Sequence, residues 1–409
     1  MPLYVERANA DYLTGQQIVE QLGAYLAGQY QAAEADLLVE IARRVALDMN
    51  ADSPTRRVES VRRLRAAAEK AIAEIGSEEA ARRVVATAMR EGEAAAIEQL
   101  GFARAAAGGT TPALNREGTA ALPFSTGLSQ GSAIAAAQLG LELTSTLEQM
   151  NARILRAVSD VYQQTIARFA GQRLLGVTTG RQAQNRAVVD FLANGITGIT
   201  YRDGKRMTMG AYAEMATRTA TNRAWLGAHV ARWAAADLHL VTIVRGVDSC
   251  PGCAAWSGRV LSTDGRTGTI EAEHATTGER VTIEITGTIE QARAGGWNHP
   301  NCRCTLAPVF AGLSLPANDS TYDPQQEKDR DRLRYLERRT RAFKLRGELS
   351  SAMGDDVSAA SWRRRARAEQ SRIREHVANT GQLRKPYRES ASFSGVAPVP
   401  NTPPALLRG

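Results

Sequence analysis

Residues 141–170 read LELTSTLEQMNARILRAVSDVYQQTIARFA, and their apolar positions recur at spacings of three and four. That period fits one face of an α-helix, so the pattern predicts a long helix with a continuous buried stripe. The stripe consists of Leu143, Leu147, Met150, Ile154, Val158, Val161, Thr165 and Phe169. Short neighbouring helices would not easily cover a stripe of this length. We therefore expect its Leu143 end to contact another protein and its Phe169 end to lie in the core.

The chain before this helix is also predicted to be helical, because it is rich in Ala, Arg, Glu and Gln. One helix should be capped by Ser53, start at Pro54 and end at Gly76. Another should run from about residue 77 to 102. It leads into a loop rich in Gly, Thr and Pro at residues 105–123, a candidate hinge.

After the long helix, the periodicity changes from helix to strand. A short helix stops at Gly195, a tight turn at Asp203-Gly204 joins two extended runs, and a helix begins near Thr208. Residues 238–246, LHLVTIVRG, have the branched apolar composition of a strand, and two alternating runs around Gly278 predict a hairpin. These signals place a small β-containing unit within a mainly helical chain.

The last hundred residues are predicted to form a charged helical arm. A linker after Pro316 precedes two helices, at about 325–351 and 358–379, and the end of the chain is a Pro-rich tail without a packed core. Residues 321–389 hold 18 Lys plus Arg against 11 Asp plus Glu, so this arm carries most of the formal net charge of +8. The excess suggests contact with nucleic acid, such as packaged double-stranded DNA, or with another acidic surface. A solvated, salt-bridged helical face explains the same charges, since acidic residues are interleaved. Trp362 in this arm could stack on a base, but packing is the simpler expectation.

All four cysteines fall into two short motifs. Cys250 and Cys253 lie in DSCPGC, and Cys302 and Cys304 lie with His299 in HPNCRC. Two such groups about 50 residues apart are typical of a structural zinc site. Zinc takes four of these five donors, so we consider the four cysteines first and a set with His299 in place of Cys302 or Cys304 second. Both Cys302 and Cys304 can bind only if the backbone kinks between them, because alternate residues of a strand face opposite ways.

The sequence offers little support for catalysis or for a membrane location. No carboxylate is singled out by its spacing from the Cys/His motifs, as a hydrolytic zinc site would need, and no glycine-rich phosphate loop follows a strand. The remaining histidines, His229, His239, His274 and His376, are isolated. No apolar run is long enough to span a bilayer, and the N-terminus lacks the features of a secretion signal. We therefore expect synthesis in a cytoplasm, where cysteines stay reduced.

Several motifs between residues 201 and 310 resemble the minor capsid proteins of tailed bacteriophages, related to the Mu F-like head morphogenesis proteins. They are TYRDGKRMTMGAYAEMATRT, DSCPGCAAWSGRVLS and TIEQARAGGWNHPNCRCTLAPVFAG, and the charged helices at 323–388 resemble the family's tail. Relatives often have His at the position of Cys304, an exchange of one metal ligand for another. The hairpin around Gly278 resembles an insertion between the two ligand pairs.

The resemblance implies a non-catalytic structural protein of the virion, in the capsid interior or at the portal vertex, made in the host bacterial cytoplasm. Its implied partners are the portal and capsid proteins, with a homo-oligomer as a further option, and its implied role is head assembly or DNA packaging and delivery. A phage-borne zinc-dependent nuclease or toxin, or a zinc-containing DNA-binding protein, is the alternative.

The expected fold class is mainly α with a small α+β zinc-clasped module, an elongated multi-helix N-terminal region and a charged helical C-terminal arm. The predicted divisions are an N-terminal helical region, a long-helix body, the Cys/His module, the basic arm and the Pro-rich tail, at residues 1–125, 126–237, 238–312, 313–389 and 390–409.

Overall fold

We describe the protein from a computed structural model. The structure describes residues 15–49, 53–106, 130–174, 181–200, 202, 206–245, 250–315 and 323–390. The helices are α1 Gly15–Asp48, α2 Pro54–Ile75, α3 Ser77–Ala106, α5 Gln130–Leu174, α6 Arg181–Leu192, α7 Met209–Ala234, α8 Pro251–Ala254, α9 Ile289–Ala294, α10 Pro324–Ala352, α11 Asp356–Thr380 and the 3-10 turn η2 Pro386–Glu389. The strands are β1 Thr197–Thr200, β2 Arg206–Thr208, β3 Leu240–Val244, β4 Leu261–Ser262, β5 Gly268–Glu273, β6 Arg280–Ile285, β7 Gly287–Thr288 and β8 Thr305–Pro308.

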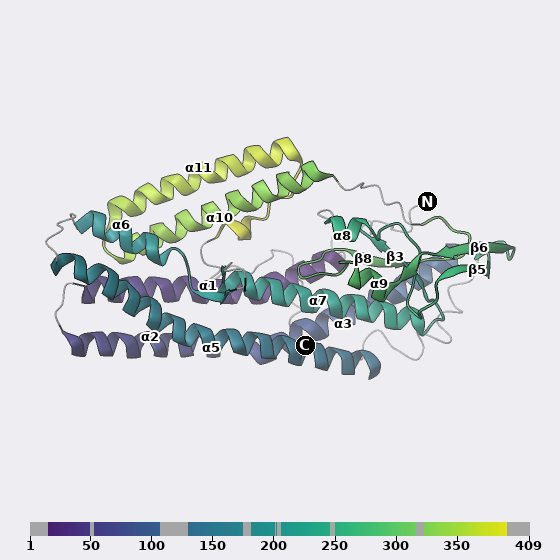
Figure 1. The fold of residues 1–409 in the computed structure, drawn as a ribbon, viewed down its shortest axis with the longest axis horizontal. Coiled ribbons are helices and arrows are strands. Elements are labelled where there is room, and N and C mark those ends of the chain that lie inside the picture. Colours follow the sequence, from purple (N-terminus) through teal and green to yellow (C-terminus); the bar gives the residue numbers. More distant parts are fainter. Residues whose placement is uncertain are drawn as a thin grey trace.

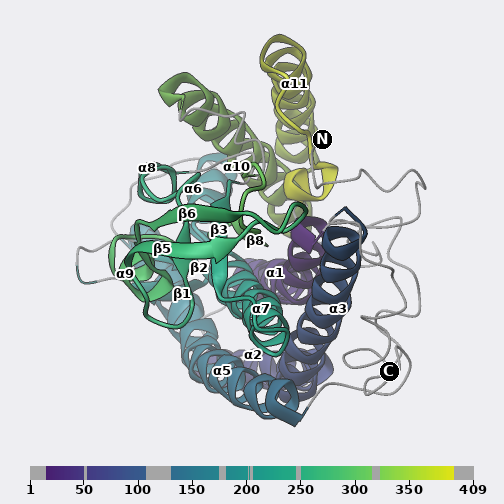
Figure 2. The same cartoon turned by 90° about the vertical axis from the view of Figure 1, so that its right-hand side faces the viewer.

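The helical body is elongated, and helices α1, α2, α3, α5 and α7 run along its long axis (Figure 1). Helices α10 and α11 lie above this body, and the small sheets gather toward one end; Figure 2 shows the same arrangement along that axis. The predicted fold class, mainly α with a small α+β module, is confirmed.

The boundaries of α2 follow the predicted signals. The Ser53 side chain accepts a hydrogen bond from the Arg56 backbone N–H at 3.4 Å, and Pro54 is the first helical residue. Gly76 ends the helix with φ of 57°, in the left-handed region that glycine adopts without a steric penalty. Ser53 and Pro54 thus set where α2 begins, and Gly76 sets where α2 stops, just before α3 begins.

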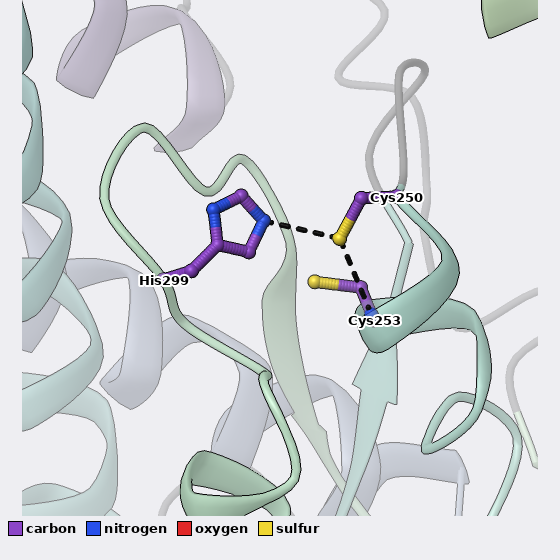
Figure 3. Close-up of side chains that lie close together, drawn as sticks. All are labelled: Cys250, Cys253 and His299. Carbon is purple, nitrogen blue, oxygen red and sulfur yellow. Dashed lines mark hydrogen bonds between the residues drawn. The ribbon is translucent and has the colours of Figure 1, made fainter. Parts of the chain in front are cut away.

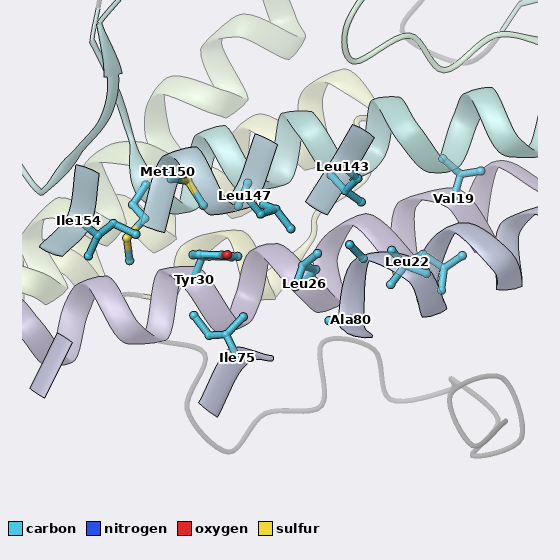
Figure 4. Packing of buried hydrophobic residues seen from close by; sticks show 14 of the residues in the cluster. Val19, Leu22, Leu26, Tyr30, Ile75, Ala80, Leu143, Leu147, Met150 and Ile154 are labelled. Carbon is cyan, nitrogen blue, oxygen red and sulfur yellow. The ribbon is translucent and has the colours of Figure 1, made fainter. Parts of the chain in front are cut away.

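The apolar stripe of α5 is buried within the chain along its length. Leu143 is 3% exposed, Ile154 is fully buried, and Phe169 is 4% exposed. Figure 4 shows Leu147 and Met150 facing Leu26 and Tyr30 of α1, with Leu143 and Ile154 on either side in the same core cluster.

The prediction that the Leu143 end contacts another protein is therefore wrong. Its premise was that neighbouring helices are short, but α1 has 34 residues and α3 has 30. Helices of that length run alongside α5 far enough to cover the stripe, in which Val161 alone is half-buried.

Buried polar groups at the helix junctions are paired with one another. The Tyr30 hydroxyl lies 2.8 Å from Ser77 Oγ and donates to Asn151 Oδ1 at 3.0 Å, which joins α1, α3 and α5. The Tyr162 hydroxyl and Ser60 Oγ both donate to Asp48. Since a buried polar group without a partner is costly, these pairs favour one register of the helices over others.

The module contains a four-stranded sheet of order β7-β4-β3-β8, in which β3 pairs antiparallel with both β4 and β8. The predicted strand at residues 238–246 is thus the inner strand β3. The predicted hairpin is β5–β6, closed at Gly278 with φ of 74°, and it projects from the end of the molecule (Figure 1). Strands β1 and β2 form the expected extended pair, and the turn at Asp203-Gly204 between them lies outside the described residues.

The predicted arm is a pair of long helices, α10 and α11, with a small core of its own made by Leu333, Leu336 and Ile373. Trp362 stacks on Phe343 with ring centroids 5.7 Å apart, so it packs within the arm as expected. Near the end of α10, Leu349 instead joins the main core. The arm is therefore docked on the body at one end through apolar contacts.

The chain after α11 returns to the body as a short segment that we call the strap, residues 384–389. Lys385 pairs with Glu20 of α1, and Arg388 Nη2 lies 2.7 Å from Glu214 Oε1 of α7. The Arg341 guanidinium of α10 donates to the Arg388 carbonyl at 2.6 Å. These charged contacts join the arm, the strap and the body.

Some predictions cannot be compared with the structure. The candidate hinge at 107–123, most of the linker after Pro316 and the tail at 391–409 lie outside the described residues. The main core takes residues from the ranges 1–125, 126–237 and 238–312. The division of the chain at those boundaries stays a prediction.

Candidate metal centre

The first Cys-x-x-Cys pair lies on the short helix α8. Cys250 is its N-cap, and Pro251 occupies the first helical position. The Cys250 sulfur accepts a hydrogen bond from the Cys253 N–H at 3.4 Å, so one helical turn brings the two thiols to the same side. Pro251 and the capping thiol of Cys250 thus favour a tight helical turn here, the local conformation that a Cys-x-x-Cys metal site needs.

The second group of donors lies on a kinked segment between α9 and β8. Asn298 and Asn301 have φ of 57° and 67°, in the left-handed region. The Cys302 N–H donates to the His299 carbonyl at 2.9 Å and closes a turn. The backbone turns just before the two cysteines, and β8 begins only after Cys304, so the alternation of a strand does not separate them.

The two groups meet, and all five predicted donors come together. Cys250, Cys253 and His299 have donor atoms within 4.8 Å of one another, and so do Cys253, Cys302 and Cys304. In Figure 3 the His299 ring points at the Cys250 sulfur, with Cys253 beside it. Cys253 belongs to both groups and is their common member.

The distances are close to the edges of a zinc tetrahedron. Cys253 Sγ lies 3.5 Å from Cys302 Sγ, and Cys250 Sγ lies 3.1 Å from His299 Nε2. Two sulfurs bound to one zinc at ~2.3 Å lie about 3.8 Å apart, and a sulfur and an imidazole nitrogen somewhat less. The donor set fits a soft divalent metal after small side-chain shifts.

The tautomer of His299 suits metal binding. Its Nδ1 lies 2.8 Å from the Pro300 carbonyl, which can only accept, so Nδ1 carries the proton. In a neutral ring Nε2 then holds the free lone pair, and Nε2 is the atom that faces Cys250. A carbonyl that fixes the second ring nitrogen is the usual outer-sphere partner of a metal-binding histidine.

The thiols in the interior of the cluster resist ionisation in the absence of a cation. Contacts with Cys302 and Cys304, together with burial, raise the pKa of the Cys253 thiol far above its usual range. Contact with Cys253 lowers the pKa of Cys302, but Cys304 and burial outweigh this and raise it to about 11. A bound cation would reverse this balance, because thiolate and not thiol is the ligand.

One face of α7 holds the second knuckle in place. The Asn301 N–H donates to Thr219 Oγ1 at 3.3 Å, Arg218 donates to Asn301 Oδ1 at 2.9 Å, and Asn222 donates to Asn298 Oδ1 at 3.2 Å. Both left-handed asparagines are therefore fixed by side chains three or four residues apart on one helix. This connects the metal centre to the body.

Sequence reasoning gave these α7 residues no role at the site. Arg218 and Thr219 stand in the motif that carried the resemblance, and Asn222 follows it. Their spacing on one helix face was the available signal. Their partners were not predictable, because Asn298 and Asn301 lie about 80 residues away.

The donor set contains no carboxylate among the described residues. Among the described residues, the grouped donors are four thiols and one imidazole, and Asp or Glu is not among them. The other histidines lie elsewhere; His229, for example, is buried between Trp225 and Trp233. The arrangement can hold a metal and stabilise the fold around it, but it offers no general base beside an open position.

The described part of the chain combines long helices that share an apolar core with one Cys/His cluster, and within the described ranges no helix is long and apolar enough to cross a membrane. A protein of this class is a mainly helical one with a candidate metal site. The comparison with known families agrees with that class. The model of phage minor capsid protein 2 matches residues 16–378, nearly the whole chain, and the protein belongs to this family. No curated protein and no solved structure matches it.

Family membership supports a structural role in the phage head. It implies a location in the virion and contact with other virion proteins. The resemblance found in the sequence is thereby confirmed, and the match reaches well beyond the motifs that suggested it, into α1 and through most of α11.

Proposed function

We propose that this chain is a non-catalytic structural component of a tailed bacteriophage head, made in the host cytoplasm and located in the capsid interior or at the portal vertex. It acts in head assembly, DNA packaging or DNA delivery. The observation that carries the proposal is the family match, because it spans body, module and most of the arm as one unit. The portal and capsid proteins are the proposed partners, and self-association is a further possibility.

The Cys/His cluster is proposed to bind a structural zinc ion. Its support is the convergence of five metal-binding donors, three of them buried and two half-buried, from two segments 49 residues apart. Cys253 is common to both groups, so it belongs to any tetrahedral set. The four cysteines remain the first choice, and a set containing His299 remains the second.

The proposed contact with double-stranded DNA rests on the exposed face of α11. Six arginines are exposed there, against the acidic Asp356 and Glu375. These six are Arg363, Arg364, Arg365, Arg367, Arg372 and Arg374. Several other basic residues of the arm, such as Arg346 and Arg388, are paired with the body instead. The DNA contact is therefore assigned to α11 and not to the arm as a whole.

Virions assembled with and without this chain would test the structural role. Purified virions should contain the protein, and cross-linking followed by mass spectrometry should join it to the portal or to a capsid protein. Heads made without it should package or deliver DNA poorly. Absence of the chain from purified virions would refute the proposal.

An assay for nucleic-acid cleavage tests the enzymatic alternative. Purified protein with DNA or RNA and a divalent metal should show no cleavage, because no general base accompanies the donor cluster. Cys250→Ala is the control. Cleavage that disappears in this variant would replace the structural role with a metal-dependent nuclease.

A further inference from the structure

Between the arm and the body lies a cleft of about 700 Å³ with a strongly basic lining. It is bounded by α1, α7, α10, the strap and the second knuckle, and Cys250 and His299 form part of its wall. Seven arginines line it against three glutamates. Arg303 and Arg330 also pair with acidic residues outside the lining, and the remaining arginines still outnumber the glutamates. How much of this positive charge is neutralised depends on the partners of the three glutamates.

Glu214 of α7 is shared between several guanidinium groups. Arg218 and Arg388 both pair with its Oε1, and the positive charge of Arg341 is close enough to help lower its pKa. Burial alone would raise the pKa of Glu214, but the three arginines outweigh it and hold this carboxyl well below its usual range. One negative charge therefore faces three positive ones.

The other two glutamates are already engaged. Glu337 receives both of its hydrogen bonds from Arg334, at 2.9 and 3.0 Å. Glu34 accepts from the backbone N–H groups of Ile196 and Gly210, at 2.9 and 3.2 Å. Glu337 also lies close enough to Arg341 and Arg388 to stabilise their charges, and Glu34 feels the charge of Arg341, so the two glutamates offset part of the positive charge around Glu214.

Two arginines of α10 add to the excess. Arg341 donates to a neutral carbonyl, that of Arg388, and burial and the charges of Arg388 and Arg338 lower its pKa. Arg338 is exposed and forms no ion pair among the described residues. The buried Arg218 also has an Nε–H without an acceptor in the described part of the chain. Both positive charge and hydrogen-bond donors are therefore available.

We propose that this cleft binds a phosphate group. A phosphate can carry two negative charges and offers oxygens in several directions, so it can accept from guanidinium groups that arrive from different helices. A single carboxylate would leave part of the positive charge unbalanced, as Glu214 does now. The volume suffices for a small polyphosphate or the end of a nucleic-acid strand.

The source of the phosphate is either a free anion or the backbone of DNA. The proposal does not depend on the zinc site, nor on the exposed face of α11, which belongs to a different surface of the arm. Failure of the cleft to bind phosphate would therefore leave the proposed structural role intact, and loss of that role would not remove the cleft.

Calorimetric titration of the full-length protein with inorganic pyrophosphate and with a 5′-phosphorylated single-stranded oligonucleotide tests the proposal. Arg338→Gln should weaken binding about tenfold or more, since it removes a charged hydrogen-bond donor. Arg341→Gln should do the same, and Glu214→Gln should tighten binding by removing the competing carboxylate. Arg62→Gln, an exposed arginine on α2 outside the cleft and outside the proposed DNA-contacting face of α11, is the matched control and should leave binding of both probes unchanged.

Binding of pyrophosphate identifies a free anion as sufficient, whereas binding of the oligonucleotide alone, weakened by Arg338→Gln, identifies DNA as the source. Arg338 is exposed, so its variant remains informative if the Arg341 or Glu214 variant fails to fold. The proposal is overturned if neither probe binds, if Arg62→Gln weakens binding equally, or if succinate binds as well as pyrophosphate.

Discussion

The helical body and the C-terminal arm are both built from long helices, but they are held in place by different forces. The body is one apolar core shared by α1, α3, α5 and α7, with fully buried residues such as Leu26 and Ile154. Apart from the Leu349 end, the arm reaches the body largely through charged pairs, including those of Lys385, Arg388 and Arg346.

This difference separates a part that must be folded from a part that can be displaced. Burial of apolar surface is insensitive to salt, whereas ion pairs near the surface are screened and are individually worth little. The arm is thus expected to respond to salt and to charge changes that leave the body unaffected. The candidate metal centre lies between the two and depends on a third kind of interaction, the coordination of a metal ion by thiolates and imidazole.

The strongest test of the body is Ile154→Asp with Val158→Asp. These side chains are fully buried, so the variant places two unpaired carboxylates in the core, at a cost of about 5 kcal/mol or more. Circular dichroism should show loss of the cooperative unfolding of the body. Ala152→Asp with Arg156→Asp, at exposed positions of the same helix, should unfold as the parent does. Wild-type unfolding of the core variant would show that the stripe is not the core.

Removal of the metal should affect the module and spare the body. We expect about one zinc per chain, loss of this zinc in Cys253→Ser, and faster hydrogen exchange in β3, β4 and β8, because metal binding contributes to folding of the module. Elemental analysis and hydrogen exchange measure both effects. His239→Asn, a variant of a histidine outside the donor groups, is the control. A metal-free protein with a fully protected module would contradict the zinc assignment.

A test by pH concerns Glu34, where body and arm meet. Burial raises the pKa of Glu34 to about 7, in spite of its backbone hydrogen bonds and the charge of Arg341. Its unfolded value is near 4.5, so the folded state binds the proton more tightly and stability is lost as pH rises from about 4.5 to 7. The loss is on the order of 3 kcal/mol.

Urea unfolding at pH 5 and pH 8 measures this effect. Glu34→Gln should lose less stability between the two pH values than the parent does, because its side chain cannot ionise. Comparing the two proteins at each pH cancels the titration of all other groups. An identical pH dependence in both would show that Glu34 is ionised without penalty in the folded state.

The smallest predicted effect is that of Asp190→Asn in α6. Asp190 accepts from Arg346 of α10 at 2.8 Å across the boundary between body and arm, and its side chain is 56% exposed. Its loss should loosen the arm by about 0.5 kcal/mol, and less at high salt. Hydrogen exchange in α10 should rise slightly while α5 is unchanged. Asp160→Asn on α5 is the control, and an equal change in that variant would count against the pairing.

The predictability of the two regions from sequence also differs. Helix boundaries at Ser53, Pro54 and Gly76 are local signals and were predicted, as were the pairs of arm helices and the hairpin at Gly278. The environment of the α5 stripe was not predicted correctly, because its burial depends on how far α1 and α3 extend alongside it. The period of a stripe indicates that one face is covered, but not by which chain.

The donors of the metal centre were predictable because cysteines are scarce and clustered. The residues that position them were not. Asn298 and Asn301 adopt the left-handed conformation, and their partners Arg218, Thr219 and Asn222 are distant in sequence. The cleft was likewise hidden, since it combines arginines from α7, α10 and the strap whose common neighbour is Glu214.

Glu20 joins three parts of the chain at one carboxylate. It lies in α1 and pairs with Arg303 beside the metal centre and with Lys385 of the strap. The strap partner follows 365 residues later. On a ribosome that adds roughly 5 to 20 residues per second, this partner emerges about 20 to 70 seconds after Glu20 does. The N-terminal helix and α7 are both complete before the strap is synthesised. Contacts that close so large a loop form late, so the order of assembly runs from the body outward, and the strap closes last.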